Sequence, residues 1–352
     1  MSTNHDHSFL KQEIWAQPEV LARLLKQEQR NAAQIAAAVR RAGVHNVLIA
    51  ARGSSDNAAR YGKYLFASFA RLPVTLAAPS LYTLYHTPPR LEHTLVVGIS
   101  QSGRSPDILA VVEEGRRQGA PTLAITNSPD SPLAAAADFL LPLHAGEERS
   151  IAATKTYTAQ LMALAMLATA LGDAHEQQAA LAEVPAAVGR CLETGDDRIA
   201  RISERYRYME TCVVIGRGYN YATAYEIALK LKELTYIVAE PYSSADFQHG
   251  PIAMIANGFP VLLLAPQGKV YAETHALAEK LAARGAELLV FSDQAPTLAL
   301  ARIPVALPVS LPEWLAPFTT ITLGQLFAYH LTLAKDYDPD HPRGLTKVTQ
   351  TR

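Results

Sequence analysis

The chain has 352 residues and a formal net charge of −1, because 32 Lys and Arg residues nearly balance 33 Asp and Glu residues. This length predicts two domains of ordinary size, and the near-neutral charge argues against nucleic acid or an anionic membrane as a partner. No apolar run is long enough to span a bilayer, and the polar start of the chain is unlike a signal peptide. Cys191 and Cys212 lie among apolar or helical residues, so we expect reduced thiols in a cytoplasmic protein.

The chain begins with a polar stretch in which His5 and His7 are more typical of a frayed end than of a metal site. A helical region over 10–43 follows, with a break at Pro18. Short apolar strands then alternate with amphipathic helices, which is typical of parallel sheets covered on both faces. The expected strands are 46–51, 73–78, 94–99, 121–126 and 138–142, then 211–216, 260–265, 287–292 and 303–307. An alanine-rich helical segment over about 172–198 separates the two groups.

Similar segments recur in both groups at nearly one spacing. The segment 46–55 resembles 212–220, since each is an apolar strand that ends in Arg-Gly. The segment 94–101 likewise resembles 260–267. Such internal similarity indicates a duplicated unit. We therefore expect two tandem, doubly wound α/β domains with three αβα layers, of the flavodoxin or Rossmann-like kind. The expected division is a helical segment 1–43, a first domain 44–172, a linker 173–198, a second domain 199–335 and an extended tail 336–352.

The turn after the third strand, "SQSGRS", is rich in small polar side chains. Ser105 is a good N-cap, followed by Pro106 and Asp107, so the turn could be no more than a well-formed helix start. Capping needs one hydroxyl, however, and the turn also holds Ser100, Gln101 and Ser102. Hydroxyl groups, backbone N–H groups and a helix dipole together bind phosphate without a lysine.

A second turn, Arg52-Gly53-Ser54-Ser55, ends the first strand of the same expected domain. Strand ends of this kind are neighbours in an open parallel sheet. Neither turn matches a P-loop or a Gly-x-Gly-x-x-Gly dinucleotide fingerprint. Two serine-rich turns facing one pocket therefore favour a monophosphate.

The helix expected over 225–235 carries Glu226, Lys230 and Glu233 at helical spacing. These residues fit a solvated face with two ion pairs, but also a carboxylate held beside a cation for proton transfer. His249 lies in a Gly-Pro loop after this helix, and Lys347 lies in the tail. The residues alone do not decide between these interpretations.

Several motifs together resemble the sugar isomerase (SIS) domain family over nearly the whole chain. They are "SQSGRSPD", "GSS" after the first strand, "AATKTYTAQ", "EIALKLKEL", "HGPIAMI" and "RGLTKVTQT". The resemblance implies that a hexose or hexosamine 6-phosphate binds, with neither a cofactor nor a metal. It assigns the phosphate to Ser54, Ser55, Ser100, Gln101, Ser102 and Ser105, and the sugar to Gly53, Ile151 and Ala153.

The resemblance also assigns roles in a reaction. Glu233 would carry a proton between C1 and C2 of the sugar, while Glu226 and Lys230 order the site. His249 would open the sugar ring in the site of a neighbouring subunit, so a homodimer is expected. Lys347 would enter the sugar pocket on the tail, as a Schiff-base amine or as a hydrogen-bond donor.

Three positions depart from the family pattern: Asp246 replaces a glutamate, Pro241 replaces a small residue, and Ala153 replaces a serine. The first two leave the shape of the His249 loop open. The family includes synthases that carry an N-terminal glutaminase with a catalytic cysteine. This chain has no cysteine before Cys191.

We therefore expect glucosamine-6-phosphate deamination, which gives fructose 6-phosphate and ammonia. The segments "GRSPDIL" and "KVTQT" also resemble the corresponding segments of the family's deaminases more than those of its synthases. The alternatives are a glutaminase-less synthase-like enzyme, a fructosamine-6-phosphate deglycase, an aldose–ketose isomerase and a sugar-phosphate sensor without enzymatic activity.

Overall fold

The computed structural model describes residues 8–347, so His5, His7 and the last four residues of the tail motif lie outside it. The chain divides into two compact units. The N-terminal unit comprises Glu19–Glu148, Lys155–Glu183 and the residues from Thr346 on. The C-terminal unit comprises the residues up to Pro18, Arg149–Thr154 and Val184–Leu345.

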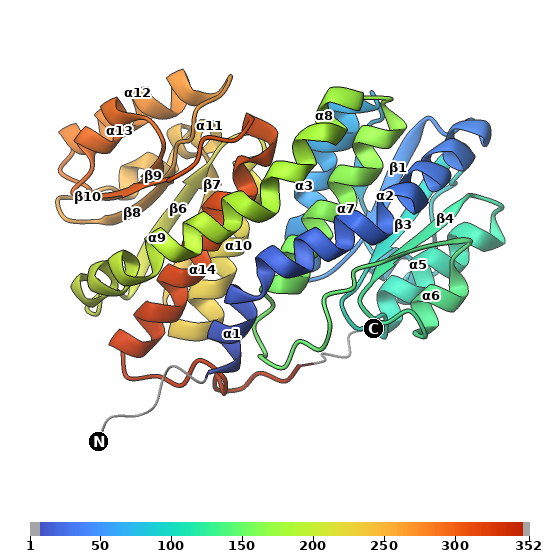
Figure 1. Ribbon diagram of the computed structural model, residues 1–352, viewed down its shortest axis with the longest axis horizontal. Coiled ribbons are helices and arrows are strands. Elements are labelled where there is room, and N and C mark those ends of the chain that lie inside the picture. The colour runs from blue at the N-terminus through green and yellow to red at the C-terminus, as the bar shows by residue number, and fades with distance from the viewer. Residues whose placement is uncertain (1–7, 348–352) are drawn as a thin grey trace. The chain divides into compact units, whose positions relative to one another are not determined.

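The N-terminal unit is built on a five-stranded parallel sheet of order β2-β1-β3-β4-β5. The strands β1, β3 and β4 are labelled in Figure 1. All five strands expected in this unit are present. They are β1 (Asn46–Ala50), β2 (Val74–Leu76), β3 (Thr94–Ile99), β4 (Thr122–Thr126) and β5 (Phe139–Pro142). The helices are α2 (Gln17–Arg41), α3 (Ser54–Phe69), α4 (Ser80–Thr83), α5 (Pro106–Arg117), α6 (Pro132–Ala136), α7 (Lys155–Leu171), α8 (His175–Ala180) and the 3-10 turn η2 (Leu181–Glu183).

The helix α7 shows why this sheet needs cover on both faces. Every residue of α7 is buried, as is every residue of β3 and β4. An apolar helix of this kind packs inside a globular unit, which explains the nearly continuous apolar segment at residues 159–171. Between residues 8 and 347, no helix combines the length and apolar character needed to cross a bilayer.

The C-terminal unit contains a second parallel sheet, of order β10-β9-β8-β6-β7. Its strands are β6 (Thr211–Gly216), β7 (Val238–Ser243), β8 (Pro260–Leu264), β9 (Glu287–Ser292) and β10 (Ile303–Ala306). The helices are α1 (Phe9–Trp15), α9 (Val184–Arg205), α10 (Asn220–Thr235), α11 (Ser244–Gln248), α12 (Tyr271–Ala283), α13 (Ala295–Leu300) and α14 (Ala316–Ala334), with the 3-10 turns η3 (Pro251–Met254) and η4 (Glu313–Leu315). In strand order, both sheets read 2-1-3-4-5 within their own unit, so the expected duplication and the α/β three-layer fold are confirmed.

Two details differ from the sequence-based expectation. The strand β7 was missed because Pro241 interrupts its apolar pattern and proline is disfavoured inside a sheet. The structure accommodates Pro241 because β7 is an edge strand that pairs only with β6. The break in the first helical region falls at Ala16, and Pro18 lies in the first turn of α2, where a missing N–H costs little.

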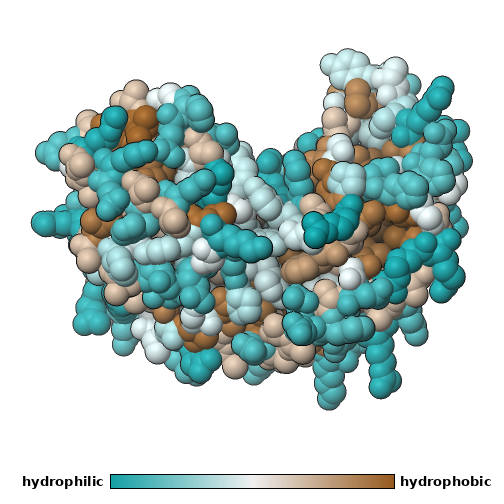
Figure 2. Space-filling view, turned by 90° about the horizontal axis from the view of Figure 1, so that it is seen from above, coloured by the Kyte–Doolittle hydropathy of each residue, from teal (hydrophilic) through white to brown (hydrophobic). Residues whose placement is uncertain are grey.

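The surface is mostly hydrophilic on the face shown in Figure 2, and its apolar residues form separate patches. Exposed large apolar side chains among the described residues include Leu84, Tyr85, Tyr208 and Val238. The buried apolar residues instead lie in the strands and on the inward sides of the helices.

Candidate functional site

The two serine-rich turns lie side by side in the N-terminal unit. β1 and β3 are adjacent and parallel, with Ala50 opposite Gly98, so the turns that follow them share one edge of the sheet. The strand order reverses between β1 and β3, since β2 lies on one side of β1 and β3 on the other. Such a switch point is where open α/β sheets bind ligands.

The "SQSGRS" turn is a compact loop held by its own hydroxyl groups. Ser100 Oγ accepts a hydrogen bond from the Gly103 N–H at 3.1 Å and lies 3.4 Å from Ser105 Oγ. Ser102 Oγ accepts from the Arg104 N–H at 3.3 Å. Gly103 has φ of 64°, and a Cβ there would lie 2.1 Å from Ser131 Oγ, so the turn requires glycine.

Ser105 is the N-cap of α5, as expected, but its side chain does not cap the helix. Instead, Asp107 Oδ1 accepts a hydrogen bond of 3.0 Å from the backbone N–H of Ile108. The hydroxyl of Ser105 therefore remains directed to the turn, beside Ser100.

Arg52 and Asp107 join the two turns, a link that the sequence analysis missed. Arg52 Nε donates to Asp107 Oδ2 at 2.7 Å, and Asp107 is fully buried. The ion pair ties the turn after β1 to the first turn of α5. The Arg-Gly pair that follows the first strand of each repeat indicated that Arg52 could matter, but the sequence pattern did not show that Asp107 is the partner of Arg52.

The second turn begins α3. Gly53 is the N-cap, with φ of 57° and ψ of −131°, a conformation that favours glycine. Ser54 and Ser55 occupy the first turn of the helix, and Ser55 Oγ accepts from Gln160 Nε2 at 3.0 Å. Gln160 is the last residue of the motif "AATKTYTAQ", so two of the motifs meet here.

Glu226, Lys230 and Glu233 form one linked array on α10. Lys230 Nζ lies 3.4 Å from Glu226 Oε1 and donates to Glu233 Oε2 at 2.5 Å. The side chains of Glu226 and Lys230 are 0% and 1% exposed, whereas that of Glu233 is 24% exposed. The solvated-face interpretation is therefore wrong, because two of the three charges are inside the protein.

His249 and Glu233 are carried on opposite faces of the sheet in the C-terminal unit. α10 covers the face of β6 that includes Gly216, where a Cβ would meet the Asn220 carbonyl group. Phe247 of α11 packs with α12 against Val213 and Ile215, which point to the other face. His249 follows α11 with an exposed side chain.

The tail is attached at defined points. In the C-terminal unit, Asp340 accepts from the N–H groups of Phe9 and Leu10 at 2.9 Å each, and Arg343 stacks on Tyr236 at 4.0 Å. In the N-terminal unit, Lys347 Nζ donates to Glu148 Oε2 at 3.2 Å. Glu148 is buried and also accepts from the N–H and hydroxyl of Thr156. The sequence analysis identified Lys347 but missed Glu148.

Ile151 and Ala153 lie in the loop Arg149–Thr154 of the C-terminal unit. Both are half-buried and alternate with the buried Ala152 and Thr154. Glu13 of α1 holds the start of this loop through Arg149 and Ser150. Glu13 was also missed, although a charge between the apolar residues Leu10 and Ile14 was a signal of a buried partner.

In the second sheet, the turn between β8 and α12 corresponds to the "SQSGRS" turn, and the side chain of Glu313 fills it. Glu313 accepts hydrogen bonds from the N–H groups of Lys269 and Val270, at 2.9 and 3.3 Å, just before α12. A Cβ at Gly268 would collide with this carboxyl group. The switch point of the second sheet is therefore occupied by a carboxylate, whereas that of the first sheet presents hydroxyl groups.

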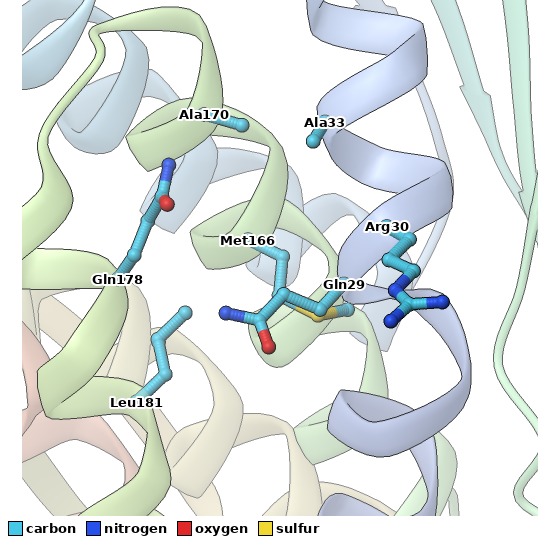
Figure 3. Close-up of a pocket in the computed structure, with 7 residues that line it drawn as sticks. All are labelled: Gln29, Arg30, Ala33, Met166, Ala170, Gln178 and Leu181. Carbon is cyan, nitrogen blue, oxygen red and sulfur yellow. The ribbon is translucent and has the colours of Figure 1, made fainter.

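A pocket of about 190 Å³ lies elsewhere in the N-terminal unit (Figure 3). Its lining residues come from α2, α7, α8 and η2, and none of them was singled out as a site residue by the sequence. No group of three or more metal-ligating side chains occurs among residues 8–347. The pocket is lined by Gln29, Arg30, Ala33, Met166, Ala170, Gln178 and Leu181.

Comparisons with known proteins agree with the duplicated architecture. The SIS domain model matches twice, over residues 42–170 and 208–335. A glutamine–fructose-6-phosphate aminotransferase (isomerizing) of Pyrococcus horikoshii is 34% identical over 348 residues. The match covers 97% of this chain and 57% of that relative, so the chain spans less than two thirds of its length.

Two solved structures share both the fold and part of the sequence. A candidate phosphosugar isomerase of Silicibacter pomeroyi DSS-3 has a TM-score of 0.85 and 32% identity, over 95% of this chain and 100% of that one. The C-terminal domain of glucosamine-fructose-6-phosphate aminotransferase from Francisella tularensis has a TM-score of 0.84 and 28% identity. That match covers 96% of this chain and 98% of the other.

Proposed function

The chain belongs to the SIS domain family, and on this premise we propose that it deaminates glucosamine 6-phosphate to fructose 6-phosphate. The reaction consumes one water and releases ammonia. It needs three steps: opening of the sugar ring, transfer of a proton between C2 and C1, and hydrolysis of the resulting C2 imine. The proposal assigns these chemical needs to particular side chains.

The array of Glu226, Lys230 and Glu233 is the observation that carries this proposal. Burying the charges of Glu226 and Lys230 costs free energy and does not improve a helix that could pack with apolar residues instead. The array leaves Glu233 as the member that reaches solvent, while Lys230 fixes its carboxylate at 2.5 Å. A fixed and accessible carboxylate suits a base that accepts the C2 proton and returns it to C1.

The serine-rich turns suit the phosphate of the same substrate. Ser100, Ser102 and Ser105 supply hydroxyl groups beside the start of α5, and Ser54 and Ser55 supply the start of α3. The helix dipoles and hydroxyl donors favour a dianionic group without a lysine. The phosphate group would therefore be held by residues that take no part in the proton transfer.

Both cysteines of this sequence differ from the reactive cysteine of a glutaminase. A glutaminase step needs a reactive thiolate. The only cysteines of this sequence are Cys191 and Cys212, which are both buried, and burial raises the pKa of each thiol to about 12. Neither of these two thiols is suited to act as that nucleophile.

His249 is proposed to open the ring in the site of a second chain. In one chain, α10 and α11 pack on opposite faces of the sheet, so Glu233 and His249 do not come from the same face. This separation supports a homodimer in which each site takes His249 from the partner. Lys347 is proposed to meet the open-chain sugar after leaving Glu148.

Ammonia release from a panel of hexosamine and fructosamine 6-phosphates tests the proposal. We expect turnover of glucosamine 6-phosphate, and a kcat lower by roughly two to four powers of ten in Glu233→Gln, which cannot accept the proton. Glu279→Gln, an exposed glutamate of α12, is the matched control and should keep full activity.

Other outcomes would replace the proposal. Release from fructosamine 6-phosphates alone would identify a deglycase, and interconversion of aldose and ketose without ammonia would identify an isomerase. Binding without any turnover would identify a sensor. A Glu233→Gln enzyme within tenfold of wild type would remove Glu233 from the role of base.

A further inference from the structure

The helix α1 carries a carboxylate on its inward side. Leu10 and Ile14 are fully buried, and Glu13, between them, is only 5% exposed. The first turn of the helix is held by two side chains. Ser8 Oγ accepts a hydrogen bond from the Lys11 N–H, and the Asp340 carboxylate accepts hydrogen bonds from the N–H groups of Phe9 and Leu10. A well-capped helix packed on its apolar side gives Glu13 a rigid base.

Glu13 binds the loop Arg149–Thr154 through three donors. Its Oε1 accepts a short hydrogen bond from the Arg149 N–H, and its Oε2 accepts from the N–H of Ser150 at 3.2 Å and from the Ser150 hydroxyl. The Arg149 guanidinium also lies over the ring of Phe9, 3.7 Å from its centroid. Two consecutive backbone N–H groups directed at one carboxylate hold the backbone direction of the loop.

The far end of the same loop is held by a second buried polar contact. Gln17 Nε2 donates to Gln325 Oε1 at 2.9 Å, and Gln325 Nε2 donates to the Thr154 carbonyl group at 3.5 Å. Between these two attachments, Ile151 and Ala153 remain half-buried, on the less buried side of the loop. The attachments therefore set the position of the two residues assigned to the sugar.

We propose that Glu13 is a positioning residue, which holds the loop in the shape that receives the sugar. The inference rests on the proposed function, because Ile151 and Ala153 are assigned by the family resemblance to the sugar that this function acts on. A buried charge is an expensive way to stabilise α1, since an apolar side chain would pack beside Leu10 and Ile14 without losing hydration. The charge is explained by the N–H groups that it orients.

The test compares Glu13→Gln with wild type in two measurements. Glutamine keeps the size but directs an NH2 group at N–H donors, so amide hydrogen exchange of Arg149 and Ser150 should become at least tenfold faster without ligand. For ammonia release, kcat/KM should fall roughly tenfold to hundredfold, with most of the loss in KM. Glu19→Gln, an exposed glutamate in the first turn of α2, is the control and should change neither.

Ser150→Ala provides a second route, including the case in which Glu13→Gln does not fold. It should weaken kcat/KM by itself. Where Glu13→Gln folds, the effect of Ser150→Ala should be much smaller in that background, because the two side chains act as one unit. Unchanged exchange in Glu13→Gln would overturn the contact. Faster exchange with unchanged kcat/KM would leave Glu13 a structural role only.

A wild-type protein that releases no ammonia would refute the proposed function rather than this inference. Binding of fructose 6-phosphate, measured by calorimetry, then replaces turnover as the readout. Weaker binding in Glu13→Gln than in Glu19→Gln supports the positioning role, and equal binding overturns it.

Discussion

Ser105 stands at the N-cap of α5, yet its hydroxyl accepts no hydrogen bond from the helix. Asp107 satisfies the Ile108 N–H instead, while it also binds Arg52. Because Asp107 rather than Ser105 binds this N–H group, the Ser105 hydroxyl lies 3.4 Å from the Ser100 hydroxyl at the carboxyl edge of the sheet. A residue pattern that looks like capping thus leaves the hydroxyl groups directed to the turn.

Replacing Ser100 and Ser102 together by alanine should mainly weaken substrate binding. Hydroxyl groups that hold a phosphate act equally on the ground state and the transition state. We therefore expect KM to rise roughly tenfold to hundredfold while kcat changes less than about threefold, measured by steady-state ammonia release. Ser68→Ala, near the end of α3, is the control. A KM equal to that of wild type would move the phosphate to another part of the chain.

Three helices of the C-terminal unit meet at Asp196. This residue of α9 lies 2.5 Å from His330 Nε2 of α14 and 3.5 Å from Lys11 Nζ of α1. Burial acts to raise the pKa of Asp196, but the hydrogen bond from His330 and the charges of His330 and Lys11 outweigh it and lower the pKa. These contacts join α1, which bears Glu13, to α9 and α14.

The lowered pKa of Asp196 predicts a pH-dependent stability. The unfolded chain binds the proton more readily, so this contribution is present above the ordinary carboxyl range near pH 4 and is lost as the pH falls through the folded value. Asp196→Asn should therefore lower Tm at pH 7, and its difference from wild type should shrink as the pH approaches 3. Thermal unfolding from pH 7 to 3 measures this. A Tm difference that stays constant with pH would show that the charge of Asp196 does not contribute.

The whole molecule is a duplication whose two copies have diverged in chemistry. Both sheets have the same strand order, but the turns at their switch points differ. The first presents serine hydroxyl groups, and the second is filled by the carboxylate of Glu313. The second copy contributes charged side chains from α10 instead. In the proposed function, the first copy would bind the phosphate group and the second would transfer the proton.

The proposed sharing of His249 between two chains predicts complementation. Glu233→Gln and His249→Ala proteins should each be nearly inactive alone. After subunit exchange, a mixed dimer has one site with both residues intact, so an equal mixture should recover up to roughly a quarter of wild-type activity. Ammonia release after mixing, with exchange verified by differently labelled chains, measures the recovery. Activity that stays at the level of the single variants would place Glu233 and His249 in one chain's site.

Much of this protein is determined by local sequence. Nine of the ten strands were predicted from short, mainly apolar segments, and the central strands β3 and β4 are buried along their whole length, as expected for a sheet covered on both faces. The serine turns follow such strands directly, so their place at the carboxyl edge of the sheet could be predicted. The spacing of Glu226, Lys230 and Glu233 likewise put them on one face of a helix.

The tertiary structure decided what depends on residues far apart in the chain. Local spacing could not tell whether Lys230 is solvated, because its burial depends on the elements that pack around α10. The partners of Glu13, Glu148 and Asp107 lie about 50 to 200 residues away in the chain. The strand β7 was missed because it contains Pro241, and a sheet accommodates proline mainly in an edge strand, which the sequence alone does not reveal. Periodicity reports which side of an element faces the core, whereas the contact that a buried charge makes depends on how the elements pack.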